Sequence, residues 1–150
     1  MQALDSADSI IYGIGNVGRE DDGLGWAFVD WIEKEGICPK AELVRSYQLH
    51  LEDADLIGRK KQILFVDASK KEEIAHFSIS KVEPKLDFSF TSHAISVQSI
   101  LATSKQCFEK IPEVYLMEIA GYEWELKIGL TQDAENNLNR SIEYFRTIVS

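Results

Sequence analysis

Residues 9–25 read SIIYGIGNVGREDDGLG, a short apolar run followed by a glycine-rich turn that carries three acids. The stretch from Gly13 to Gly18 has the glycine spacing of a phosphate-binding loop, in which a strand leads into a helix whose amide groups receive a pyrophosphate. Glu20, Asp21 and Asp22 stand where that anion would lie. Clustered carboxylates repel a phosphate and attract a cation. The stretch therefore predicts a strand, a turn that attracts cations, and a helix.

The composition is that of a folded domain. The length of 150 residues predicts a single domain, 1–150, with enough core to fold without disulfides or bound metal. Acids outnumber bases by 25 to 16, and the net charge is −9. Because phosphate contacts need clustered Lys and Arg, this balance argues against a nucleic-acid partner. The basic doublets Lys60-Lys61 and Lys70-Lys71 are interpreted as solvated strand ends.

The two cysteines, Cys38 and Cys107, share no Cys-x-x-Cys spacing and have no nearby histidine. Two free thiols in a reducing compartment are therefore favoured over a disulfide or a zinc site. The sequence shows neither a signal-peptide pattern nor an apolar run long enough to span a bilayer. We therefore expect no membrane partner.

Apolar runs rich in β-branched residues alternate with segments of helical period, which is typical of a sheet covered by helices on both faces. This pattern predicts an α/β fold of three layers, α/β/α, with a twisted and mostly parallel sheet of five strands. In residues 74–82 apolar and polar side chains alternate, which favours an edge or antiparallel strand. The predicted strands cover 9–14, 41–47, 62–66, 74–82 and 113–119, and the predicted helices cover 24–35, 51–58, 93–108 and 131–149.

Open α/β sheets bind ligands at the carboxyl ends of their strands. Asp21 and Asp22 follow the first predicted strand, Asp67 ends the third, and His93 lies in the loop after the fourth. Two carboxylates and an imidazole at one edge would form a mixed nitrogen and oxygen ligand set suited to Ni²⁺, Zn²⁺ or Mn²⁺. Asp67 taken alone is equally well explained as a helix cap or turn former.

Four blocks in this order carry a family resemblance: Gly13-Ile-Gly-Asn16 with Asp21-Asp22-Gly23-Leu-Gly25, Phe65-Val-Asp-Ala68, Ser92-His93, and Gly129-Leu-Thr131. From about residue 9 to residue 149, the chain resembles the hydrogenase maturation endopeptidases, which trim the C-terminus of the large subunit of nickel-iron hydrogenases. The resemblance implies that Asp22, Asp67 and His93 contact nickel. It also implies a cytoplasmic monomer whose partner is the precursor of that large subunit.

One segment departs from the family pattern. Where the family commonly has an Asp-Gly-Gly-Thr stretch after the second strand, this chain has residues 45–51, RSYQLHL. Gln48-Leu49 resembles the branch that serves bidirectional, NAD-linked hydrogenases. His50 and His76 match no motif, and we interpret both as surface residues.

The resemblance implies hydrolysis of one peptide bond in a precursor that already carries nickel. Asp22, Asp67 and His93 would bind that nickel weakly, with substrate thiolates as further ligands, and a free carboxylate such as Asp21 would accept a proton. The acidic turn acting in recognition alone is equally compatible with the sequence. Two alternatives remain: a nucleotide or dinucleotide module built on Gly13, Gly15 and Gly18, and an inactive relative that chaperones a hydrogenase subunit.

Overall fold

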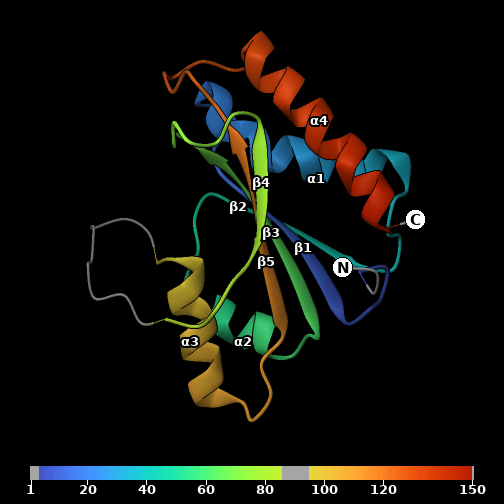
Figure 1. Cartoon of the computed structure of the whole chain (residues 1–150). Helices are drawn as coiled ribbons and strands as arrows, with labels where there is room; N and C mark the ends of the chain where they lie inside the picture. Colours follow the sequence, from blue (N-terminus) through green and yellow to red (C-terminus); the bar gives the residue numbers. More distant parts are fainter. Residues whose placement is uncertain (1–3, 86–94, 150) are drawn as a thin grey trace.

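The central strand of the sheet is β3 (Gln62–Ser69), which pairs in parallel with β1 (Ser9–Ile14) on one side and β5 (Glu113–Ala120) on the other. Beyond β1 lies β2 (Glu42–Ser46), and beyond β5 lies β4 (Phe77–Lys81). This computed structural model describes residues 4–85 and 95–149 (Figure 1). β4 is one of the two edge strands and runs antiparallel to β5, so the five-stranded, mostly parallel sheet is confirmed.

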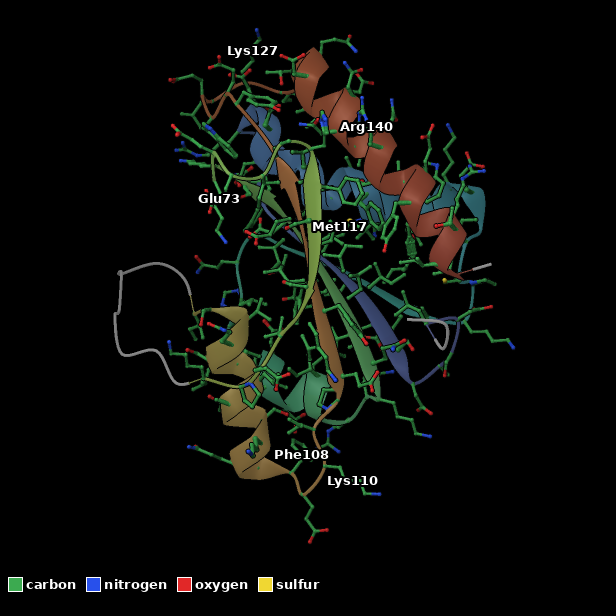
Figure 2. The ribbon with its side chains drawn as sticks, viewed as in Figure 1. Glu73, Phe108, Lys110, Met117, Lys127 and Arg140 are labelled. Atoms are coloured by element: carbon green, nitrogen blue, oxygen red, sulfur yellow. The ribbon has the colours of Figure 1, made fainter. Side chains whose placement is uncertain are left out.

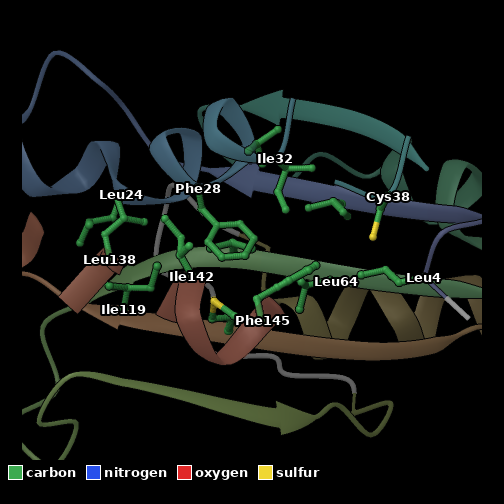
Figure 3. Packing of buried hydrophobic residues seen from close by; sticks show 14 of the residues in the cluster. Leu4, Leu24, Phe28, Ile32, Cys38, Leu64, Ile119, Leu138, Ile142 and Phe145 are labelled. Atoms are coloured by element: carbon green, nitrogen blue, oxygen red, sulfur yellow. The ribbon is translucent and has the colours of Figure 1, made fainter. Parts of the chain in front are cut away.

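The helices form a layer on each face of the sheet. α1 (Leu24–Glu35) and α4 (Gln132–Val149) share one cluster of buried side chains with the sheet, and α2 (Asp53–Gly58) and α3 (Val97–Cys107) share another (Figure 2). In the first cluster Phe28 of α1 meets Phe145 of α4, with their ring centroids 5.2 Å apart (Figure 3). The predicted α/β/α layering is therefore confirmed.

Local signals set three of the helix ends. α1 ends at Gly36, whose φ of 64° is the left-handed conformation that glycine adopts without a Cβ clash. α4 begins after Thr131, whose Oγ1 accepts a hydrogen bond from the backbone N–H of Ala134 at 3.2 Å. α3 begins later than predicted, at Val97, because Ser96 caps it by accepting from the N–H of Ser99.

β3 is longer than predicted. The predicted strand ended at Val66, but the ladder with β5 continues to the pair Ser69 and Ala120. β1 pairs with β3 only as far as Val66, so the last three residues of β3 have a strand partner on one side alone. Asp67 therefore lies within a strand, at the point where its neighbour β1 has turned away.

The cysteines agree with the expectation of free thiols. Cys38 is buried, Cys107 is exposed, and neither forms a disulfide. Burial raises the pKa of the Cys38 thiol to about 11. A thiol with this pKa is protonated at neutral pH and therefore poorly reactive. Within the described residues, none of the helices is both long and apolar enough to cross a bilayer.

Candidate functional site

A pocket of about 580 Å³ opens beside the carboxyl ends of β1 and β3, on the face of the sheet that carries α2 and α3. Three acidic side chains line it, Asp22, Asp67 and Glu118, together with Lys71 and Lys81. The rest of its wall comes from the end of β1, the β2–α2 loop, the end of β4, the start of α3 and β5. These residues are Ile14, Gly15, Tyr47, Gln48, Leu49, Ser80, Val82, Ile95, Ser96, Val97, Gln98 and Leu116. The pocket therefore combines ionisable groups with a mixed polar and apolar wall.

Two glycines allow the acidic turn to fold closely onto the strand ends. Gly15 has a φ of +140°, and a Cβ placed on it would lie 1.9 Å from the carbonyl oxygen of Asp22. A Cβ on Gly25 would lie 2.4 Å from the carbonyl oxygens of both Ile14 and Val66. Because only hydrogen fits at these positions, the start of α1 lies directly against β1 and β3. This contact brings Asp22 to the pocket.

Asp22 accepts hydrogen bonds from the backbone amide that a phosphate-binding loop would present to its ligand. The backbone N–H of Asn16 donates to Asp22 Oδ2 at 3.0 Å and to the Asp22 carbonyl oxygen at 3.1 Å. A phosphate could bind the Asn16 amide only by displacing the Asp22 carboxylate, whose negative charge would repel it. Burial raises the pKa of Asp22, and the Asn16 hydrogen bond opposes part of that rise. The geometry thus disfavours the dinucleotide alternative.

Asp67 is the strongly perturbed acid of the pocket. Burial raises its pKa from 3.8 to about 7 and outweighs the hydrogen bond from the N–H of Ala68, while the charges of Asp22 and Glu118 add to the rise. Its Oδ1 accepts that bond at 2.8 Å. Opposite charge nearby would favour the ionised form of both aspartates. The pair is therefore suited to receiving a cation.

Asp67→Asn should stabilise the free protein more at high pH than at low pH. The folded-state pKa lies above the unfolded value, so stability is present below 3.8 and is lost as the pH rises through about 7. Asparagine removes the cost of burying that charge. We expect the gain in free energy of unfolding to be larger at pH 8 than at pH 5 by on the order of 2 kcal/mol. Urea unfolding at both pH values measures it, and an equal gain at both would contradict the raised pKa.

Asp21 is not the free carboxylate that the sequence analysis expected. Its side chain is 0% exposed and accepts four hydrogen bonds. The donors are the backbone N–H groups of Tyr122, Glu123 and Thr131, at 2.8, 3.1 and 2.7 Å, and the hydroxyl of Thr131, at 2.8 Å. Asp21 therefore joins the acidic turn to the β5–α4 loop, and its lone pairs are already used. Asp21 is therefore not a free carboxylate, and it is not among the residues that line the pocket.

Glu118 is the pocket acid that the sequence analysis missed. It pairs in register with Asp67 across β3 and β5, and its Oε1 lies 3.1 Å from Nζ of Lys71. Its side chain is 17% exposed, whereas that of Lys71 is 56% exposed. A charged residue inside the apolar run of residues 114–120 was the available signal.

The arrangement matches solved structures. The [NiFe] hydrogenase maturation protease HycI from Thermococcus kodakarensis KOD1 superimposes with a TM-score of 0.74 at 19% identity, covering 94% of this chain and 91% of its own. The fold is that of the hydrogenase maturation proteases. The E. coli hydrogenase maturating endopeptidase HybD has this fold too, with a TM-score of 0.70, 17% identity and coverage of 91% and 88%. No family profile matches the sequence, and no curated protein matches it.

In this hydrogenase maturation protease fold, two of the three expected nickel contacts line one pocket. Asp22 and Asp67 lie together there, as the sequence analysis predicted for the strand ends. His93 lies outside the described residues. Among residues 4–85 and 95–149, no group of three His, Cys, Asp or Glu side chains is arranged to hold a metal. The described part of the chain thus places two of the three predicted nickel contacts in one pocket.

Trp124 belongs to the loop between β5 and α4, whose amides donate to Asp21. Its ring packs against Gly121, where a Cβ would lie 2.9 Å from it, and Nζ of Lys70 lies 4.8 Å from the ring centroid. His50 is exposed, as expected. His76 is exposed as well, with Nδ1 2.9 Å from Oδ1 of Asn137. Neither histidine is among the residues that line the pocket.

Proposed function

We propose that this protein is an endopeptidase that removes a C-terminal peptide from the nickel-loaded precursor of a nickel-iron hydrogenase large subunit. The observation that carries the proposal is the placement of Asp22 and Asp67 in one pocket of a hydrogenase maturation protease fold. The proposal includes action in the cytoplasm, as a monomer that meets its substrate transiently. Hydrolase, protease and maturation roles are named for the structural neighbours.

Nickel belongs to the substrate in this proposal. Asp22, Asp67 and His93 would supply oxygen and nitrogen ligands, and the precursor would supply the rest. The two described carboxylates fit this role because burial raises the pKa of each, and a nearby cation would favour their ionised forms. Binding the nickel would fix the precursor with its scissile bond at the pocket. A nickel-free precursor would lack this contact and would not be cut.

The pocket wall also bears on the choice of precursor. Tyr47, Gln48 and Leu49 line it and replace the family's Asp-Gly-Gly-Thr stretch. The indole N–H of Trp26 donates to the carbonyl of Ser46 at 3.0 Å, and the Trp26 ring stacks on Tyr47 with centroids 5.4 Å apart. The segment is therefore held against α1 and presents Tyr47, which is 64% exposed. We assign it to substrate selection, in keeping with the proposed branch that serves bidirectional hydrogenases.

Mass spectrometry of a cognate precursor, with and without nickel, tests the proposal. We expect loss of a C-terminal peptide only from the nickel-loaded form, and cleavage at least about 100-fold slower with Asp67→Asn or His93→Ala. The matched control is Asp133→Asn, an exposed aspartate in the first turn of α4 that should leave cleavage unchanged. If a correctly loaded precursor stays intact in every reaction, the protein acts in binding or as a chaperone instead.

A further inference from the structure

The Lys70-Lys71 doublet lies beside the pocket carboxylates, so its interpretation as a solvated strand end is incomplete. Lys71 lines the pocket and forms the 3.1 Å ion pair with Glu118. The charge of Lys70 interacts with the charge of Asp22. Each lysine therefore acts on a different acid of the pocket.

Both lysines are held in place by neighbouring parts of the fold. The N–H of Lys71 donates to Oγ of Ser69 at 3.2 Å, and the N–H of Gly121 donates to the Ser69 carbonyl at 3.0 Å. The Lys70 ammonium lies over the ring of Trp124, an arrangement in which the ring face attracts the cation. Because Asp21 fixes the loop that carries Trp124, the position of Lys70 depends on the same loop.

We propose that Lys70 and Lys71 are selectivity residues that weaken the binding of free divalent cations at Asp22 and Asp67 and so reserve the site for nickel carried by the precursor. This inference rests on the proposed function. It assigns to the two lysines a property of the free protein that can be measured without any precursor.

Electrostatics gives the two lysines this effect. A hydrated divalent ion brings two positive charges and is repelled by both ammonium groups. Nickel that already has thiolate ligands brings little or no net positive charge, so the same repulsion is small. A free ion must also compete with Lys71 for Glu118, the carboxylate beside Asp67. The lysines therefore discriminate by the charge of the incoming metal group.

Titration calorimetry of the free protein with Ni²⁺ tests the inference. We expect the double variant Lys70→Met with Lys71→Met to bind Ni²⁺ at least about tenfold more tightly than the unaltered protein. Lys70→Arg with Lys71→Arg should bind as weakly as the unaltered protein, because both charges remain. Lys105→Met, which removes an exposed lysine of α3, is the matched control and should change nothing.

Two further arms separate charge from structure. The gain in affinity should shrink in 1 M salt, where charges are screened over about 3 Å. Adding Glu118→Gln to the double methionine variant should reverse part of the gain, because the carboxylate freed from Lys71 is then removed. Exposed ion pairs and lysines contribute little to stability, so the methionine variant should fold, and its thermal melting curve checks this.

The outcomes distinguish this inference from the proposed function. Unchanged or undetectable Ni²⁺ binding by a folded methionine variant overturns the lysine role, and so does tight binding by the arginine variant. Neither result changes the expectation that the unaltered protein cleaves the nickel-loaded precursor. Failure of that cleavage overturns the proposed function, whatever the calorimetry shows.

Discussion

Replacing Asp21 with alanine is expected to lower the free energy of unfolding by at least about 4 kcal/mol. The substitution removes the acceptor for three backbone N–H groups and one hydroxyl, at distances from 2.7 to 3.1 Å. These donors belong to the β5–α4 loop and the cap of α4, and the substitution takes away the buried carboxylate that they share. The loss should separate this loop from the acidic turn and so displace Asp22. Urea unfolding measures the change.

Asp21→Asn provides a sharper comparison than alanine, since it keeps the side-chain volume. All four partners donate, so the asparagine NH₂ group would face donors and the variant should still lose on the order of 2 kcal/mol or more. The control Asp133→Ala, at an exposed position, should stay within about 1 kcal/mol of the unaltered protein. Asp21→Asn with full stability would contradict the role of the carboxylate as a multiple acceptor.

Gly25→Ala is expected to destabilise the protein by about 3 kcal/mol, although alanine normally favours helix over glycine by about 1 kcal/mol. The sign reverses because the new Cβ would lie 2.4 Å from the carbonyl oxygens of Ile14 and Val66. Those atoms are backbone of β1 and β3 and cannot rotate away. The start of α1 must therefore move off the sheet. We expect a lower urea midpoint together with loss of cleavage, because Asp22 moves with it.

Gly18→Ala is the comparison for the effect of glycine itself. At Gly18 a Cβ would meet only the side chain of Asn16, with its nearest atom at 3.1 Å, and we expect a change of less than about 1 kcal/mol. If Gly25→Ala were as stable as the unaltered protein, the close contact between α1 and the two strands would be wrong.

The elements of the fold were largely predictable because their signals are local. The apolar run before Gly13 and the periodic apolar positions after Gly23 give a strand and a helix on their own. The antiparallel edge strand was likewise visible as alternation in residues 74–82, although the strand itself covers only Phe77–Lys81. The length of β3 was not predictable from its own sequence. Its last residues are held in a strand only by pairing with β5, which lies far along the chain.

The site was predictable only in part, for the same reason. Asp21 and Asp22 are neighbours of the same type, and nothing in the turn itself tells which of them faces the pocket. Backbone amides of residues 122–131 donate to Asp21 and hold it away from the pocket lining, so Asp22 is the one that lines the pocket. Glu118 becomes a pocket residue only through its register with Asp67. Carboxylates that follow a strand can be recognised from the sequence. Carboxylates that reach the pocket only because their strand pairs with a distant one cannot.

The register of β3 also bears on how the chain folds. Gln62 pairs with Ser9 on one side and with Glu113 on the other, so both ladders join segments that are distant along the chain. Non-local pairing of this kind costs loop-closure entropy before any contact compensates for it, and it slows folding. We therefore expect the two halves of the pocket to form late and together during folding. A nascent chain that lacks β5 would not yet have the β3–β5 pairing that puts Asp67 and Glu118 side by side.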